Sequence, residues 1–457
     1  MNPVQTLPVW LRRTLWTIYH EWLSRDHVYR YWMELRRSQW YIPERLVDIA
    51  HRRLAVIIDY AVSQVPYYRA LANDGQIKVG KGMTPIESLR TFPLLDKSII
   101  RSRASDLLCK SIPASQVKKS STSGSTGESL YFFLNLVNGA WRYAGKMRHT
   151  EWCGVSPFER HATLWGARFD TPAHTLLGDR LRLALRPLLF LSSYELDEYT
   201  MGEYLRQLKA FRPVLLTSYP TPLARFAEFY QSKGENFPTL KAIICSAEQL
   251  FDHQRKNISE VLQVPVFNRY GCREFADIAH ECDIHRGMHV DIERLWVEVL
   301  REDGSPCAPG ELGEIVVTDL TNKAMPFIRY RIGDLGAWAS SPCPCGRGLP
   351  LLEYVEGRAF DLIKTSSGKE ISGTFWTLLG RYVSGRIDAL QVRQTRIDMI
   401  DLLLVMRDGQ PLKSEEEKLL RQKIAETAEG LEVAIEYVES IPETLSGKRR
   451  FIISSIN

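Results

Sequence analysis

Short apolar runs that alternate with helical stretches in the middle of the chain are the feature that most constrains its fold. The runs are residues 214–217, 240–245 and 262–268, and helical stretches follow the first two, over 222–233 and from about 247. This alternation indicates β-α-β units and a parallel sheet that is buried on both faces. We therefore expect an α/β protein.

The pattern changes after residue 295. Short strand-like stretches at 295–300, 313–318 and 337–339 are separated by Gly, Pro and Asp. They predict a small β-rich subdomain at the end of a large domain.

A second change follows near residue 360 and predicts a small α+β domain at the C-terminal end. Its expected elements are two strands, a charged helix and a last strand, at 389–395, 399–406, 414–429 and 432–438. The expected division is a helical extension, a large domain and a small mobile domain, over residues 1–80, 81–360 and 361–457.

An aromatic-rich helical region occupies residues 9–40. Its apolar side chains recur at helical spacing: Trp10, Leu11, Leu15, Ile18, Trp22 and Leu23. Such a helix is either an interfacial helix that contacts a membrane or a partner, or a helix packed on its own domain. We favour packing and keep peripheral membrane contact through residues 9–40 as the alternative.

Composition excludes several classes of protein. Among 457 residues, 44% are hydrophobic and 25% are charged, which is typical of a soluble globular chain and not of a disordered one. Residues 1–150 contain 22 Lys and Arg against 11 Asp and Glu, a balance that favours phosphate ligands or an anionic surface, or is simply solvated. No dense basic block suggests nucleic-acid binding. Eight cysteines without a disulfide framework or a recognisable secretory signal predict a cytoplasmic protein.

A run of small residues at 120–127 is the first motif that can carry chemistry. It reads Ser-Ser-Thr-Ser-Gly-Ser-Thr-Gly and is followed by an apolar, strand-like stretch. Backbone N–H groups and hydroxyls of such a loop can converge on phosphate oxygens, and glycine permits the close approach. The loop lacks the Lys-Ser/Thr pair of a P-loop.

Four further motifs follow in order along the chain. Glu274 ends a Tyr-Gly-x-x-Glu segment just after an apolar run, where a carboxylate is well placed for Mg²⁺ or substrate. Asp334 ends a Tyr-Arg-x-Gly-Asp segment and can accept the hydrogen bonds of ribose hydroxyls. The last two are Gly357-Arg358-x-x-Asp361 and Ser446-Gly447-Lys448.

Together, these motifs resemble those of the adenylate-forming superfamily. More narrowly, they look like the branch of phenylacetate–CoA ligases and their CapK-like capsule-biosynthesis relatives. The resemblance spans roughly residues 85–450. It implies that a carboxylic acid attacks the α-phosphorus of ATP to give an acyl-adenylate, which then passes its acyl group to an acceptor.

The resemblance also implies residue roles. Lys448 would bridge the α-phosphate and the carboxylate, and Glu274 with Thr126 would position Mg²⁺. Asp361 would be the hinge of the mobile domain. The remaining nucleotide-binding residues would be Ser123, Gly124, Ser125, Gly127, Ser246, Glu248, Tyr270, Gly271, Asp334 and Arg358.

One departure concerns the exit of the phosphate loop. The family loop ends Gly-x-Pro, whereas this chain has Gly127-Glu128-Ser129. The change removes no ligand, and Glu128 adds a negative charge beside the phosphates.

A group of cysteines and histidines predicts a structural Zn²⁺ site. Cys343 and Cys345 form a C-x-C in a Pro/Gly turn, and Cys282 precedes two histidines, His285 and His289. Three thiolates and one imidazole suit tetrahedral Zn²⁺ with no open position. We prefer His289 over His285 as the fourth ligand because Gly287 lets the chain turn back, and because some members of this branch carry Gly-x-His there.

The predicted function is that of an ATP-dependent, AMP-forming acid–thiol ligase, with ATP, Mg²⁺, a carboxylic acid and coenzyme A as its partners. Two alternatives remain. The adenylate passes to an amine, hydroxyl or carrier instead, or the chain is a non-catalytic nucleotide-binding relative. Neither the identity of the acid nor the oligomeric state follows from the sequence.

Overall fold

The computed structural model describes most of the chain. The described residues are 7–80, 82–122, 130–165, 185–193, 196–234, 239–358, 363–366, 370–371, 376, 386–428, 430–442, 452–454 and 456. The chain divides into two compact units, Met1–Ile332 with Gly336–Tyr354, and Gly333–Leu335 with Val355–Asn457.

An eleven-stranded sheet runs through the described residues in the order β10-β11-β12-β13-β9-β8-β7-β6-β5-β3-β4. Its parallel half consists of β3 (His161–Trp165), β4 (Leu188–Ser192), β5 (Leu215–Ser218), β6 (Ala242–Ser246) and β7 (Val266–Cys272). Strands β5 and β6 coincide closely with the predicted apolar runs at 214–217 and 240–245. The run at 262–268 overlaps β7 only at 266–268, because Leu262 still belongs to the preceding helix. The parallel α/β sheet expected from the sequence is confirmed.

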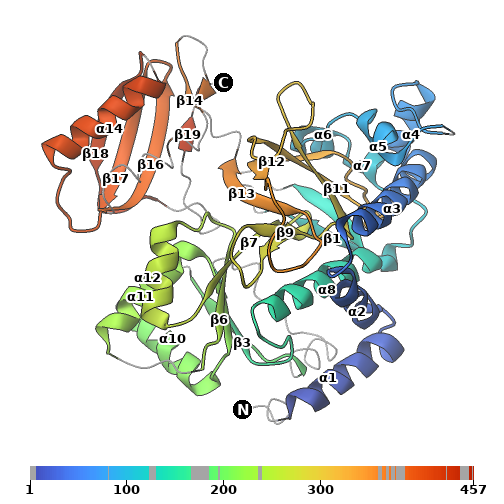
Figure 1. Ribbon diagram of the computed structural model, residues 1–457, viewed down its shortest axis with the longest axis horizontal. Helices are drawn as coiled ribbons and strands as arrows, with labels where there is room; N and C mark the ends of the chain where they lie inside the picture. Colours follow the sequence, from blue (N-terminus) through green and yellow to red (C-terminus); the bar gives the residue numbers. More distant parts are fainter. Residues whose placement is uncertain are drawn as a thin grey trace. The chain divides into compact units, whose positions relative to one another are not determined.

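Alternation of side chains explains why these short strands are almost wholly apolar. One face, with Leu164, Leu216 and Ile243, packs against α10 (Glu198–Phe211), α11 (Pro220–Ser232) and α12 (Asp252–Leu262), the three helices grouped in green in Figure 1. The other face, with Leu215 and Ile244, packs against residues that follow α8 (Leu136–Trp152). Both faces are therefore buried, as parallel sheets require.

Antiparallel strands complete the sheet. They are β8 (Ala276–Glu281), β9 (Met288–Val290), β10 (Leu295–Leu300), β11 (Gly313–Asp319), β12 (Tyr330–Trp338) and β13 (Leu351–Arg358). The β-rich part thus continues the parallel half in one sheet and does not form a sheet of its own. The predicted strand at 337–339 is the end of the much longer β12.

The N-terminal helices are α1 (Val9–Ile18), a π-helical turn η2 (Tyr19–Leu23) and α2 (Val28–Ser38). Trp16 and Trp32 are fully buried in one apolar cluster with Ala144 and Met147 of α8. Further helices are α3 (Pro43–Gln64), α4 (Pro66–Asn73), α5 (Pro85–Arg90), α6 (Lys97–Ser102), α7 (Ala104–Leu107) and the 3₁₀ turn η3 (Ala114–Gln116). One face of the aromatic-rich region is therefore core.

The smaller unit has a four-stranded sheet in the order β18-β17-β16-β19 among its described residues. Its elements are β14 (Ile363–Lys364), β15 (Glu370–Ile371), β16 (Ile387–Arg396), β17 (Met399–Met406), α14 (Ser414–Thr427), β18 (Glu432–Tyr437) and β19 (Ile452–Ser454). Leu420 and Ile424 of α14 pack on Val392, Leu402 and Leu404 of the sheet. Both strands and the charged helix lie where the sequence predicted them.

Candidate active site and metal cluster

The candidate site begins in the turn between β7 and β8. Gly271, near the end of β7, is required for this turn, because a Cβ at this position would lie 2.3 Å from the Ala276 carbonyl oxygen. Glu274 follows in the turn and is buried. Its Oε1 accepts a hydrogen bond of 3.0 Å from the Tyr330 hydroxyl at the start of β12. The turn therefore presents a carboxylate that is held at one oxygen.

Arg142 of α8 stabilises the backbone of this turn. Its guanidinium donates hydrogen bonds to the carbonyl oxygens of Arg273 (2.7 Å) and Glu274 (3.2 Å). Burial lowers the pKa of Arg142, and the nearby charge of Arg294 lowers it further. Sequence reasoning missed Arg142 and Tyr330 as supports of Glu274, since only the fold brings them together.

The Ser/Thr/Gly run is carried by a hairpin of β1 (Val117–Ser121) and β2 (Tyr131–Asn135), which pair antiparallel. Thr122 closes the described end of this hairpin, where its N–H donates to the Leu130 carbonyl oxygen at 2.9 Å. Arg273 donates from Nη1 to the Ser121 carbonyl oxygen at 3.4 Å. The stem of the predicted phosphate loop thus contacts the turn that carries Glu274.

Several predicted residues lie outside the described part of the chain: Ser123, Gly124, Ser125, Thr126, Gly127, Asp361 and Lys448. Arg358 ends β13, but its side chain is also outside that part. Asp334 is half-buried in β12, four residues after Tyr330.

A row of side-chain positions crosses the carboxyl edge of the parallel strands. Trp165 ends β3, Tyr219 directly follows β5, and Ser246 at the end of β6 pairs with Arg269 of β7. Trp165 and Tyr219 have ring centroids 4.1 Å apart, and the Arg269 guanidinium lies 6.0 Å from the Trp165 ring. Ligands of open α/β sheets bind at this edge.

The predicted adenine-side segment has a local structural role as well. Ser246 Oγ donates to the Arg269 carbonyl oxygen at 2.9 Å, which joins the ends of β6 and β7. Glu248 Oε2 accepts a hydrogen bond of 3.2 Å from the Thr221 N–H in the first turn of α11. Both residues therefore hold the edge of the sheet in place.

Charged side chains of α8 lie near this edge. The side chain of Lys146 reaches solvent, yet many protein atoms surround it. The resulting loss of hydration, together with the nearby charge of Arg269, lowers the pKa of Lys146 to about 8. Asp277 pairs with Arg269 at 3.6 Å, and its pKa lies well below the usual range because these cationic neighbours outweigh its burial. This arrangement places the ammonium group of Lys146 where it can bind a polar group of a substrate.

The cysteine and histidine side chains predicted to bind Zn²⁺ lie together. The ligand atoms of Cys282, His289, Cys343 and Cys345 are all within 4.8 Å of one another. His285 does not join them, because its Nδ1 lies 3.0 Å from Glu281 Oε2.

The spacing of this cluster fits tetrahedral Zn²⁺. The sulfurs of Cys282 and Cys343 are 3.7 Å apart, close to the separation of about 3.8 Å that two Zn–S bonds of about 2.3 Å give at a tetrahedral angle. Cys345 Sγ lies 3.3 Å from His289 Nε2. His289 Nδ1 faces the Leu349 carbonyl oxygen at 3.4 Å, a contact typical of a metal-bound imidazole.

The protonation states of His289 and Cys282 without metal are also compatible with a metal site. Burial lowers the pKa of His289 to about 4, so its ring is neutral, the form that binds metal. Burial, aided by the neighbouring thiols, raises the pKa of Cys282 to about 12. Metal binding here would therefore release thiol protons.

The chain is similar to several known proteins. Residues 363–455 match the family model described as the CapK C-terminal domain. Protein CapK of Staphylococcus aureus is 23% identical over 414 residues, 90% of each chain. Phenylacetate-coenzyme A ligase of Thermus thermophilus is 26% identical over 340 residues, 70% of this chain and 72% of the relative.

Solved structures extend the match to the whole fold. A 2-hydroxyisobutyryl-CoA ligase, solved in the postadenylation state with an acyl-AMP, superposes with a TM-score of 0.70 at 20% identity and covers 92% of both chains. The chain has the fold of the adenylate-forming superfamily. CapK and the phenylacetate-coenzyme A ligases are its relatives.

No helix in the described ranges is long and apolar enough to cross a membrane.

Proposed function

We propose that the protein is an ATP-dependent, AMP-forming ligase that activates a carboxylic acid as an acyl-adenylate and passes the acyl group to coenzyme A. The observation that carries this proposal is the contact between Arg273 and Ser121, because it holds the carboxylate of Glu274 beside the stem of the Ser/Thr/Gly loop. Similarity to a phenylacetate-coenzyme A ligase over 70% of the chain, and to an acyl-CoA ligase structure over 92% of it, supports the same activity.

The proposed roles follow the order of the reaction. Hydroxyls and N–H groups of residues 123–127 hold the β- and γ-phosphates of ATP, and Glu274 with Thr126 holds Mg²⁺, which neutralises phosphate charge. Asp334 accepts the hydrogen bonds of the ribose hydroxyls, and Arg358 contacts the nucleotide near its ribose and phosphates. Ser246, Glu248, Tyr270 and Gly271 border the adenine.

The chemical step joins two anions, and its barrier falls when a positive group neutralises their charge. We assign this role to Lys448, whose ammonium bridges the α-phosphate and the substrate carboxylate during attack. The small domain would turn about Asp361 to bring this residue to the site. The acid itself would lie along the Trp165 to Arg269 row.

The relatives support coenzyme A as the acceptor, since several are named coenzyme A ligases and one solved neighbour contains both an acyl-AMP and coenzyme A. A second candidate is transfer to an amine, hydroxyl or carrier. The CapK relative and the CapK C-terminal domain match favour it.

Trapping with hydroxylamine tests the proposal. The protein with ATP, Mg²⁺ and an acid should form a hydroxamate without coenzyme A, and adding coenzyme A should divert the acyl group to a thioester. Hydroxamate without thioester would favour the second candidate. Absence of both, with ATP bound and across acid classes, would favour a non-catalytic relative.

The metal cluster belongs to the proposal as a structural Zn²⁺ site. Four protein ligands leave no open position for chemistry. A cytoplasmic location is our expectation for a chain with eight free cysteines. Membrane contact through residues 9–40 stays a prediction.

A further inference from the structure

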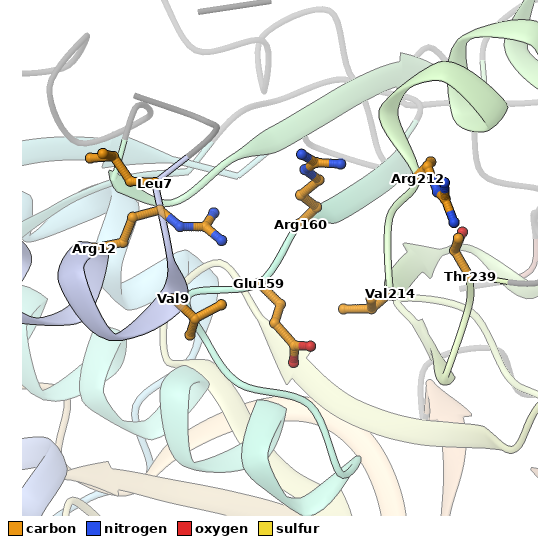
Figure 2. Close-up of a pocket in the computed structure, with 8 residues that line it drawn as sticks. All are labelled: Leu7, Val9, Arg12, Glu159, Arg160, Arg212, Val214 and Thr239. Carbon is orange, nitrogen blue, oxygen red and sulfur yellow. The ribbon is translucent and has the colours of Figure 1, made fainter. Parts of the chain in front are cut away.

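A pocket of about 360 Å³ lies at the opposite edge of the parallel strands from the candidate active site (Figure 2). Arg160 lines it just before β3, and Arg212 lines it just before β5. Arg12 and Val9 line it from α1. Because these residues precede their strands, the pocket is distinct from the site at the carboxyl edge.

Arg12 is the most unusual residue in this pocket. Only 5% of it is exposed, and its Nε and Nη1 are buried without a hydrogen-bond partner. Burial and the nearby charge of Arg160 both lower its pKa. In Figure 2 its guanidinium points into the space between Arg160 and Glu159. A buried charge without partners is costly unless a counterion meets it.

The lining supplies that counterion only in part: the charge of Glu159 raises the pKa of Arg12, but less than burial and the charge of Arg160 lower it. Glu159 is the one carboxylate among the described residues that line it. Its Oε2 accepts from the Ser156 N–H at 2.7 Å, and its Oε1 accepts from Lys241 Nζ at 2.8 Å. The charge of Glu159 is therefore shared with Lys241, while three guanidinium groups line the pocket.

We propose that this pocket binds a phosphate group. Guanidinium groups present planar, paired donors that match phosphate oxygens, and several of them together favour a multiply charged oxyanion over chloride. Arg160 spends one donor on the Phe211 carbonyl oxygen at 3.3 Å, which fixes its position and leaves other donors for the ligand.

Two sources can supply such a group, a free phosphate compound or a phospholipid headgroup. The second is relevant because α1 and η2 carry exposed apolar side chains on the face turned away from the core: Trp10, Leu15, Ile18, Trp22 and Leu23. The chemistry recognised in the pocket is the same for both sources.

The first arm of the test measures thermal unfolding of the full-length protein in inorganic phosphate and in chloride at equal ionic strength. The melting temperature should rise with phosphate concentration, because a ligand of the folded state stabilises it. The rise should be lost in Arg12→Met and Arg212→Gln. It should persist in Arg225→Gln, which removes an exposed cation of α11 outside the pocket.

Arg12→Met should itself fold, because it replaces a buried unpaired charge with an apolar side chain of similar length. In phosphate-free buffer it should melt no lower than wild type. If it fails to fold, Arg212→Gln carries the test alone, since Arg212 is exposed.

The second arm measures cosedimentation with phosphatidylcholine vesicles with and without phosphatidic acid. Binding that requires phosphatidic acid and is lost in Arg212→Gln would assign the pocket to a headgroup. A phosphate effect that persists in both variants would locate binding at the active site and overturn the proposal. Absence of a phosphate effect and of lipid-dependent binding would overturn it equally.

Discussion

At the scale of single residues, Glu274 is buried, and neighbouring residues hold both its side chain and its backbone. The Tyr330 hydroxyl occupies one carboxylate oxygen and Arg142 fixes the backbone of the turn. Carboxylate oxygens are preferred ligands of Mg²⁺. We therefore propose a functional role for Glu274, although a lone Glu after an apolar run is usually a surface residue.

Glu274→Gln tests that role. The amide oxygen can still accept from Tyr330, whereas the negative charge is lost, so acid-dependent adenylation should fall by about 10²–10³-fold. The melting temperature should change little. Tyr330→Phe is the matched control, because it removes the hydrogen bond and keeps the charge, and most of its adenylation rate should remain. A wild-type rate in Glu274→Gln would remove Glu274 from the mechanism.

His149 is a second residue with a measurable signature. It lies between Asp291 (2.9 Å) and Asp277 (3.2 Å) in a buried network that also holds Arg148 against Asp291 and Glu293. Burial alone would lower the pKa of His149, but these two carboxylates outweigh it and raise the pKa. The folded protein therefore holds this proton more tightly than the unfolded chain does.

The sign of the pH dependence follows from linkage. The stabilisation by His149 is fully present below the unfolded pKa of about 6.5 and is lost as the pH rises through the raised folded value. The difference in free energy of unfolding between wild type and His149→Gln should be largest at pH 6 and should shrink towards pH 9. Urea unfolding over this range measures it, and a difference that grows with pH would be the opposite result.

At the scale of elements, the metal cluster joins the segment between β8 and β9 to the segment between β12 and β13. It lies close to the N-terminal helices, because Gly348 donates its N–H to the Gln39 carbonyl oxygen at 3.0 Å. A bound Zn²⁺ would thus hold these two segments together, next to the N-terminal helices.

Removal of the metal should therefore lower the melting temperature. Binding energy of a structural Zn²⁺ is folding energy, so both a strong chelator and Cys345→Ser should destabilise the protein. Cys307→Ser is the control, since Cys307 is a free thiol outside the cluster. Elemental analysis of the purified protein should find zinc; a metal-free protein that melts at the same temperature with chelator would exclude the site.

The N-terminal helices give a second test at this scale. Trp16 is fully buried against α8, whereas Trp22 on the outward face is 76% exposed. Trp16→Ala should cost about 3–5 kcal/mol of the free energy of unfolding, and Trp22→Ala should change it by less than about 0.5 kcal/mol. Equal effects in urea unfolding would contradict the assignment of one face to the core and one to solvent.

Sequence patterns predicted some elements better than others, for physical reasons. The strands β5 and β6 were predictable because burial on both faces makes them apolar runs. Only the first part of β7 was predicted, since Asn268 and Arg269 end its apolar character. Only the end of β12 was recognised, since Arg331 and Asp334 interrupt its apolar character. The helix expected from about 247 begins at Asp252, after a turn in which Ala247 has a φ of 68°.

The residues of the candidate site likewise divide into those that the sequence reveals and those that only the fold reveals. Glu274, Asp334 and the cysteines stand in short motifs that a sequence displays. The supports of Glu274, the Arg273 contact to Ser121 and the arginine pocket join residues far apart in the chain, so they became visible only in the fold.

At the scale of the whole molecule, we propose that a large α/β unit holds the nucleotide and that a small α+β unit supplies Lys448. The division of the chain into two compact units is consistent with such a mechanism. The domain motion and the role of Lys448 are proposals, and they predict that ATP binding and adenylation can be separated by mutation.

Pyrophosphate release from ATP and Mg²⁺ across a panel of carboxylic acids, with and without coenzyme A, tests the central claim most directly. We predict release that depends on one class of acid, does not require coenzyme A for the first turnover, and disappears in Lys448→Ala while ATP binding is kept. Release without any acid dependence, or an unchanged rate in Lys448→Ala, would contradict the account. So would a protein that binds ATP and releases no pyrophosphate with any acid.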